Sequence, residues 1–281
     1  MSKRIIGIVM LLALAFCLTA CAMFAEPTEP PTPPESVHTQ PTPEPSVDPS
    51  EQEEPPVDPV PDPEPSSEPE TEPEHSELYI EGLAVEDVIT YFNEVCLDCE
   101  YIISGDPSVV QKWMEPIFYV VHGDPTEEDL EVLNEFTVWL NTIEGFPGIY
   151  AAQDADYPNL QIYFCSGPDM LELLGENFFY MDGGVTFWYD GENQIYDATI
   201  CCRTELDQQL RNSVILEEIY NGLGPVQDTA LREDSIIYAE FSQPQALTEI
   251  DELILRLLYH PDIQCGMNAE ECEAVIRKLY Y

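Results

Sequence analysis

Basic residues are scarce in this chain of 281 residues: nine Lys and Arg stand against 55 Asp and Glu, for a formal net charge of −46. Because proteins bind nucleic acid mainly by neutralising phosphates with Lys and Arg, this shortage argues strongly against a DNA- or RNA-binding role. The same shortage excludes attraction by charge to anionic lipid headgroups. Long apolar runs are also missing after the N-terminal segment, so no later part of the sequence is predicted to span a bilayer.

Residues 1–20 have the pattern of an export signal. Lys3 and Arg4 precede an apolar run, residues 5–16, and small residues follow it. Residues 18–21 read Leu-Thr-Ala-Cys, which resembles the lipobox of bacterial lipoproteins. This resemblance implies cleavage before Cys21, a diacylglycerol on its thiol, and a lipid-anchored protein that faces outside the cytoplasm. The alternative is an ordinary signal peptide with an unrelated Cys.

Residues 21–76 have a different composition from the rest of the chain. They contain seventeen of the 26 prolines, fifteen carboxylates and no Lys or Arg. With so little apolar surface to offset the entropy of ordering, the segment is predicted to be a disordered, extended, acidic tether. A tether fits better than a Pro-rich ligand for another protein, since such ligands often carry basic residues.

Residues 77–281 are predicted to form one globular domain. The domain has 40 acidic and seven basic residues, a balance that favours cationic partners but mostly provides solubility. Apolar periodicities, turn signals and caps predict an α+β fold with a mixed sheet. The predicted strands are 116–121, 160–165, 184–189 and 195–202, and the last two are joined as a hairpin through 190–193. An amphipathic helix is predicted to end near Cys96, and a second helix is capped by Thr126 and Asp129 and has a buried stripe of Leu130, Leu133, Phe136 and Leu140. Further helices are predicted near 170–174, 205–223, 248–259 and 268–279, the last with Asn268 as its N-cap and Glu271 at N3.

Seven cysteines remain after Cys21, and outside the cytosol they can oxidise. Cys96 and Cys99 form a lone CxxC without a second pair or a nearby His, which favours a structural disulfide or inert thiols over a zinc or redox site. Among the many possible pairings, we prefer Cys265 with Cys272, because they flank the start of the last helix.

The helix over 205–223 is predicted to be central, because apolar side chains lie on two of its sides. Glu217, Glu218 and Asn221 continue one of these apolar stripes at 100° per residue. Buried carboxylates are costly unless they are hydrogen-bonded, protonated or bound to a cation. The sequence therefore predicts that these three side chains share a buried polar site.

Residues 217–228 resemble the zinc helix of the metzincins, HExxHxxGxxH followed by Asp. Glu217, Asn221 and Gln227 stand where that family has its three zinc-binding histidines, whereas Glu218 matches the catalytic glutamate and Asp228 the final Asp. Residues 235–238 resemble the Met-turn, with Ile for its Met, and residues 247–259 resemble the helix that follows. The resemblance implies a degenerate zincin-like scaffold in which the helix packs against the sheet.

The sequence also resembles an uncharacterised bacterial lipoprotein family, domain of unknown function 2927. The matching features are Trp-x-x-Pro-Ile at 113–117, a helix at 217–224 that follows the family's EExxQxLG with Asn221 for the Gln, a segment at 247–261 that resembles LxxLDExLLRxLYxP, and Gly-Met at 266–267. They cover roughly residues 100 to 275. The family has no established activity, so this resemblance implies a fold and a cellular setting and leaves the reaction open.

Three hypotheses follow. The first is a non-catalytic zincin-like domain that binds a ligand or an envelope protein, without a cofactor. The second is a hydrolase or peptidase with a cation held by oxygen ligands from Glu217, Asn221, Gln227 and Asp228, and with Glu218 as general base; such ligands suit Ca, Mg or Mn better than Zn. The third is a purely structural lipoprotein. We favour a non-catalytic role, because every metzincin His is replaced and His122 and His260, expected on loops or the surface, lie outside the helix.

Overall fold

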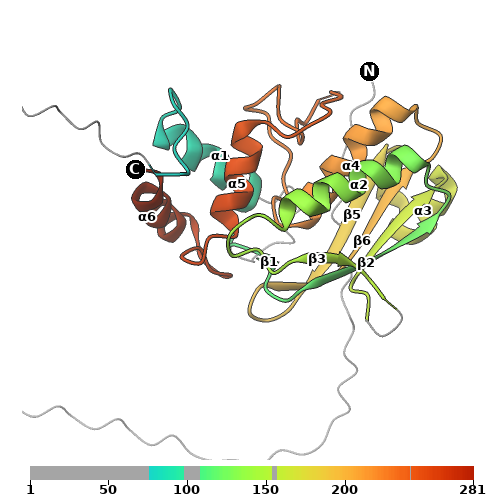
Figure 1. The fold of residues 1–281 in the computed structure, drawn as a ribbon, viewed down its shortest axis with the longest axis horizontal. Coiled ribbons are helices and arrows are strands. Elements are labelled where there is room, and N and C mark those ends of the chain that lie inside the picture. The colour runs from blue at the N-terminus through green and yellow to red at the C-terminus, as the bar shows by residue number, and fades with distance from the viewer. Residues whose placement is uncertain (1–75, 98–107, 154–156, 241) are drawn as a thin grey trace, which may run out of the picture. The chain divides into compact units, whose positions relative to one another are not determined.

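The computed structural model describes residues 76–97, 108–153, 157–240 and 242–281 (Figure 1). The predicted signal segment, Cys21 and the predicted tether up to residue 75 lie outside the described residues, as does Cys99 of the CxxC. The remainder corresponds to the predicted globular domain.

A six-stranded sheet forms the centre of the fold, with the order β1-β6-β4-β2-β3 and with β5 paired to β6. Four of the five strand pairings are parallel, and only β5 with β6 is antiparallel. The predicted mixed sheet is confirmed, but the architecture is mixed α/β rather than α+β, because four of the five pairings are parallel and crossover helices lie between β2 and β3 and between β4 and β5. The strands are β1 (Lys112–Trp113), β2 (Ile117–Gly123), β3 (Ile149–Ala151), β4 (Leu160–Cys165), β5 (Gly183–Tyr189) and β6 (Gln194–Arg203).

Apart from α3 and η1, the helices fall into two groups (Figure 1). Helix α4 packs against β5, β6 and α2, whereas α1 packs against α5 and α6. Among the described residues, no helix has the length and apolar character needed to cross a membrane. The helices are α1 (Val85–Leu97), α2 (Glu127–Leu140), α3 (Gly167–Leu174), the 3₁₀ helix η1 (Glu176–Phe178), α4 (Gln208–Gly222), α5 (Glu249–Leu258) and α6 (Ala269–Tyr280).

The local signals in the sequence placed most of these elements correctly. The capping boxes predicted at Thr126 and Asn268 are confirmed. The predicted hairpin is also confirmed: the Asp190 side chain accepts bonds from two backbone N–H groups of the turn, and Asn193 adopts φ 62°. Leu130 was wrongly predicted to be buried and is 44% exposed. At 100° per residue it lies roughly 60–120° around α2 from Leu133 and the rest of the stripe.

The sheet has a hydrophobic core on each face. The larger core lies between the sheet and the helices α1, α2, α4, α5 and α6. The smaller core lies under α3 and η1 on the opposite face and consists of Met170, Leu174, Phe178, Met181 and Cys201. Alternating side chains of β4 and β6 therefore enter different cores.

The predicted disulfide between Cys265 and Cys272 is wrong, since both residues are free thiols. Cys272 is buried on α6, which packs against α1, whereas the half-buried Cys265 places its Sγ atom 3.8 Å from the backbone oxygen of Lys112. Cys96, Cys165, Cys201 and Cys202 are also free thiols.

Candidate functional site

Helix α4 is the central helix that the sequence predicted. It begins after the N-cap Asp207, whose carboxylate accepts a bond from Leu210 N, and every residue from 213 to 222 is buried. At its C-terminal end, side chains from other elements satisfy two backbone carbonyls. Trp113 Nε1 donates to Gly222 O at 2.9 Å, and the Tyr259 hydroxyl donates to Leu223 O at 2.8 Å. Both ends of the helix are thus fixed by specific partners.

The structure places Glu217, Glu218 and Asn221 in the buried half of α4, as predicted. Their exposed fractions are 5%, 3% and 1%. Glu218 lies directly against the start of β5: a Cβ atom on Gly183 would lie only 2.7 Å from Glu218 Oε1. Gly183 is therefore needed at this position, because any side chain there would displace the carboxylate or Val214 beside it.

Asn221 has an unusual environment. Neither its amide oxygen nor its amide nitrogen has a hydrogen-bond partner among the described residues. The Ser213 hydroxyl, two turns earlier on the same helix, is also without one there. Leaving a buried polar group unsatisfied costs about 1–3 kcal/mol, so this part of the helix has free capacity to bind a water molecule, an ion or a polar ligand group.

Gln227 and Asp228 follow α4 in an irregular segment. The backbone N–H of Gln227 donates to Val95 O at 3.2 Å, and its side-chain amide donates to the backbone oxygen of Asp228 at 3.2 Å. In the described part of the chain, no group of three or more His, Cys, Asp or Glu side chains is arranged to hold a metal ion. A shared site that includes Gln227 therefore stays a prediction.

The two histidines of the domain lie away from α4, as the sequence indicated. His122 is half-buried on β2, rather than on a loop, where its Nε2 atom lies 2.8 Å from Gln161 Oε1 and its ring stacks on Tyr163. His260 follows α5 and accepts a bond from Asp262 N.

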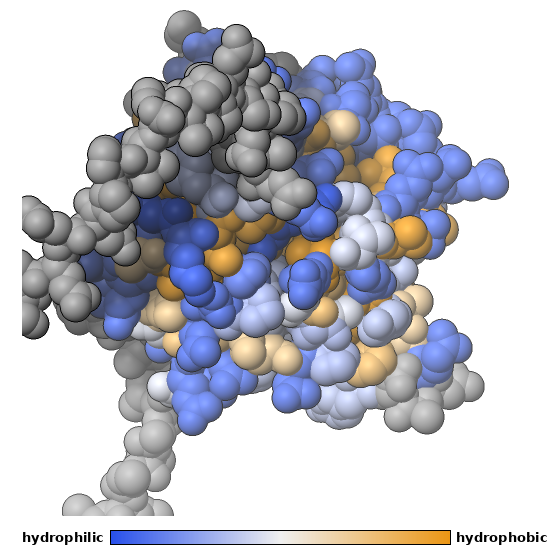
Figure 2. All heavy atoms as spheres, turned by 60° about the vertical axis from the view of Figure 1, so that its left-hand side comes forward, coloured by the Kyte–Doolittle hydropathy of each residue, from blue (hydrophilic) through white to orange (hydrophobic). Residues whose placement is uncertain are grey.

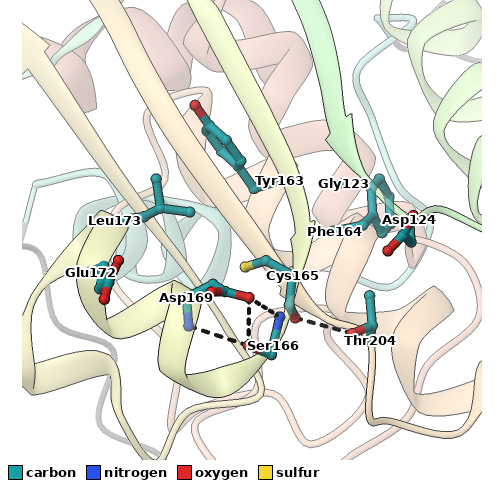
Figure 3. A pocket seen from close by; sticks show the side chains of 10 residues that line it. All are labelled: Gly123, Asp124, Tyr163, Phe164, Cys165, Ser166, Asp169, Glu172, Leu173 and Thr204. Atoms are coloured by element: carbon teal, nitrogen blue, oxygen red, sulfur yellow. Dashed lines mark hydrogen bonds between the residues drawn. The ribbon is translucent and has the colours of Figure 1, made fainter.

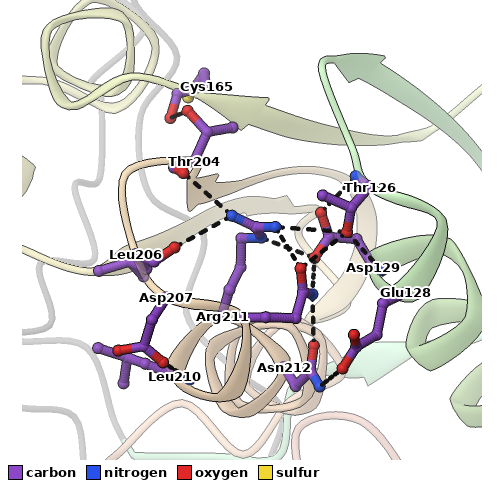
Figure 4. A network of polar contacts seen from close by, with 11 residues as sticks. Thr126, Glu128, Asp129, Cys165, Thr204, Leu206, Asp207, Leu210, Arg211 and Asn212 are labelled. Carbon is purple, nitrogen blue, oxygen red and sulfur yellow. Dashed lines mark hydrogen bonds and ion pairs between the residues drawn. The ribbon is translucent and has the colours of Figure 1, made fainter.

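A buried ion pair at the N-terminal half of α4 was missed by the sequence reasoning (Figure 4). Arg211 Nε donates to Asp129 Oδ1 at 2.7 Å, and the two side chains are 7% and 0% exposed. Burial alone would raise the pKa of Asp129, but the bonds from Arg211, the Thr126 backbone and Gln208 lower it below its usual value. Arg211 also donates to the backbone oxygen of Thr204, so the pair joins α2, α4 and the loop after β6. The sequence did hold one indication of a buried ion pair: Arg211, one of only seven basic residues in the domain, lies on a helix predicted to be buried.

A second buried network surrounds Asp251, which is 0% exposed. Its carboxylate accepts bonds from the hydroxyls of Tyr91 and Ser235 at 3.1 and 2.7 Å, and from the backbone N–H groups of Ile236 and Thr248 at 3.2 and 2.9 Å. The network connects α1, α5 and the turn at 235–238, the segment that resembles the Met-turn. The Thr248–Asp251 capping box of α5 is the feature of the sequence that could have pointed to Asp251. Nothing in the sequence indicated that Tyr91 would contact it.

Comparisons with known proteins assign the domain to a family. The search of curated proteins and the search of solved structures found no match. A family model described as "Protein of unknown function (DUF2927)" matches residues 85–278, which is well over half of the chain and covers every helix and sheet strand described above except the last two residues of α6. The chain therefore belongs to the DUF2927 family.

Proposed function

We propose that this protein is a lipid-anchored, extracytoplasmic lipoprotein whose acidic tether presents a non-catalytic, zincin-like domain for binding or envelope interaction. The signal pattern of residues 1–20, the lipobox ending at Cys21 and the Pro-rich composition of 21–76 support the anchor and the tether. The membrane is then contacted through the lipid, and the partner is an envelope protein or another ligand.

The observation that carries the non-catalytic role is the burial of α4 at the positions that resemble the zinc helix. A zinc hydrolase commonly uses three protein ligands, often His, and an open position for water and substrate. Here Glu217 and Asn221 take two of the His positions, and Glu218 takes the catalytic position with 3% of its surface exposed. A side chain so enclosed has little access to a peptide substrate.

Surface chemistry supports a binding role. On the face shown in Figure 2, hydrophilic residues surround separate hydrophobic patches. Several aromatic side chains are also exposed, including Tyr157 at 89%, Tyr180 at 79% and Tyr196 at 54%. Aromatic side chains provide large contact areas at low entropic cost, and the excess of carboxylates favours a cationic partner.

The second candidate is a divergent metal-dependent hydrolase with Glu218 as general base and oxygen ligands from Glu217, Asn221 and Gln227. Asn221 favours it, because its buried amide has no partner among the described residues. Amide and carboxylate oxygens suit Ca, Mg or Mn. The site fits such an ion by the chemistry of its donors, and the ion would polarise a carbonyl group of the substrate.

The two candidates predict opposite results for Glu218→Gln. In a non-catalytic domain, the wild type does not cleave a mixed peptide library with Ca, Mg, Mn or Zn supplied in turn, so Glu218→Gln has no activity to abolish. Glu217→Ala lowers the melting temperature because it leaves a buried polar partner unsatisfied. Hydrolysis and thermal unfolding are both measured, with Glu270→Gln as the control, because Glu270 is an exposed carboxylate on α6. Metal-dependent cleavage that is lost in Glu218→Gln and kept in the control would establish the hydrolase instead.

The anchor is tested by Cys21→Ala. Without the thiol no lipid is attached, so the protein is expected to move from the membrane fraction to soluble or unprocessed material. Cell fractionation and the mass of the mature N-terminus measure this change, with Cys17→Ala, inside the signal segment, as the control. A processed Cys21→Ala protein that still sediments with membranes would contradict the anchor.

A further inference from the structure

The face of the sheet opposite α4 is only partly covered. Helices α3 and η1 pack over its part near the carboxyl ends of the parallel strands, where Cys201 and its partner Gly184 lie beneath them. Nearer the start of β4, the side chains of Phe118, Tyr150 and Trp188 belong to neither hydrophobic core, because their neighbours along each strand point into the larger core instead. This part of the sheet is therefore open to solvent.

One row of residues crosses this open surface from edge to edge. The strand register pairs Tyr150 with Phe118 and Asp197 with Trp188. Asn159, directly before β4, connects the two pairs through backbone hydrogen bonds to β2 and β6. These five residues, called the aromatic row below, follow the order β3, β2, β4, β6 and β5 across the sheet. The two residues at its ends are both exposed, Tyr150 at 51% and Trp188 at 37%.

The aromatic row has a platform at each end. Phe118 and Tyr150 form one, with their ring centroids 6.3 Å apart, and Trp188 forms the other. Phe118 and Trp188 are three strand spacings apart, which is roughly 14 Å at about 4.8 Å per spacing. This distance suits an elongated ligand that offers a flat apolar surface at more than one point along its length.

Polar side chains lie between the two platforms. The carboxylate of Asp197 is half-buried, and burial is the influence that raises its pKa, since no hydrogen bond or opposite charge from the described residues acts on it. Gln161 and Thr199, which pair with each other, lie on the same face one step further along the strands. Neither Lys nor Arg lies in these two rows. Asp197 can therefore accept hydrogen bonds from donor groups of a ligand.

The charges around the aromatic row exclude an anionic ligand. Besides Asp197, a cavity at the carboxyl ends of β2 and β4, with Tyr163 in its wall, carries the carboxylates of Asp124, Asp169 and Glu172 (Figure 3). The predicted tether, with its fifteen carboxylates and no Lys or Arg, would be repelled from this surface, and so would a second copy of a domain with 40 acidic and seven basic residues. A ligand without negative charge and rich in donors complements it.

We propose that the aromatic row binds a linear, uncharged glycan. A sugar ring has a flat face of C–H groups, which packs on the electron-rich face of an aromatic ring, and a rim of hydroxyl groups, which donate hydrogen bonds to a carboxylate. The two platforms stack separate sugar rings of one chain, and Asp197 accepts bonds from hydroxyls between them. This proposal rests on the binding role proposed above and names its ligand class, but it uses neither the lipid anchor nor the α4 site.

The experiment titrates the full-length protein with cellohexaose or chitohexaose, two neutral linear glycans, and follows binding by calorimetry and Trp fluorescence. We expect a disaccharide of the same sugars to bind at least about tenfold more weakly than the hexamer, because it reaches only one platform. Hexagalacturonate, a linear anionic hexamer, should also bind at least about tenfold more weakly at low ionic strength, and high salt should reduce this difference.

Variants test the platforms and the carboxylate separately. Trp188→Ala should weaken hexamer binding about tenfold and remove the dependence on glycan length, whereas Trp188→Phe, which keeps a ring, should restore part of the affinity. Asp197→Asn should weaken binding several-fold and reduce the discrimination against hexagalacturonate. The matched control is Tyr281→Ala, because Tyr281 is 64% exposed but lies beside Tyr280 at the end of α6, and its loss should change nothing.

Three results would overturn the proposal. They are no saturable binding of either neutral hexamer, equal binding of the anionic hexamer at low ionic strength, or an equal loss of affinity in Tyr281→Ala and Trp188→Ala. A dimer that Trp188→Ala dissociates would assign the surface to a second copy instead. If Trp188→Ala does not fold, the length and charge dependence of the wild type decide. The Cys21→Ala and peptide-cleavage tests have separate readouts, so this ligand class can fail while the proposed function stands.

Discussion

Replacing Arg211 with Met is expected to lower the free energy of unfolding by about 3–5 kcal/mol, the usual cost of removing one partner from a buried ion pair. The change leaves the carboxylate of Asp129, which is 0% exposed, without its cation. It also removes the bonds from Arg211 to the backbone oxygens of Thr204 and Leu206, which hold the loop between β6 and α4. Urea denaturation followed by circular dichroism measures the loss.

The control for this prediction is Arg232→Met. Arg232 also forms an ion pair, with Asp234 at 3.1 Å, but the two side chains are 34% and 60% exposed. Exposed pairs contribute about 0–1 kcal/mol, so the loss should be small. A similar loss for Arg211→Met and Arg232→Met would show that burial of the Arg211 pair is not important for stability.

Acid should weaken the wild type through the same pair. Because the pKa of Asp129 is lower in the folded protein than in the unfolded chain, its contribution is complete above the unfolded pKa of about 3.9 and is lost as the pH falls through the folded value. Arg211→Met removes the bond that lowers this pKa, so the difference in stability between wild type and variant should shrink over that acidic range. A constant difference would contradict this assignment.

The second large effect is expected for Asp251→Ala. The variant leaves the hydroxyl groups of Tyr91 and Ser235 and the backbone N–H groups of Ile236 and Thr248 without their shared acceptor. Each unsatisfied buried group costs about 1–3 kcal/mol, although such costs are not additive, so a loss of at least about 3 kcal/mol is expected. Thermal and urea unfolding measure it.

Glu271→Ala is the matched control for Asp251→Ala. Glu271 has the same position in the capping box of α6, where it accepts a bond from Asn268 N at 3.0 Å, but it is exposed. Loss of a capping interaction alone costs roughly 0.5–2 kcal/mol. If Asp251→Ala costs no more than Glu271→Ala, then Asp251 acts only as a helix cap, and its bonds to Tyr91 and Ser235 add nothing.

The candidate site shows how far the sequence reasoning reached. Periodicity alone placed Glu217, Glu218 and Asn221 on a buried stripe, because a helix repeats every 3.6 residues and apolar neighbours mark its buried sides. Their partners were not predictable, because a polar side chain in a core meets residues from other elements. Gly183, which gives Glu218 its space, is 35 residues away in the sequence and carries no pattern that indicates this role.

The sequence by itself determined the features that depend on neighbouring residues. It indicated the scarcity of basic residues, the caps at Thr126 and Asn268, the hairpin turn and the central helix α4. Caps and turns are local hydrogen bonds between residues a few positions apart, so the residue types that make them are visible in order.

Only the tertiary structure decided the contacts between distant segments. Arg211 and Asp129 are 82 residues apart, and Tyr91 and Asp251 are 160 apart. The tertiary structure also decided the parallel order of the strands, which places Cys165 and Cys201 on neighbouring strands. The physical reason is that burying apolar surface selects the arrangement of the elements as a whole, and that arrangement determines which distant polar and thiol groups meet.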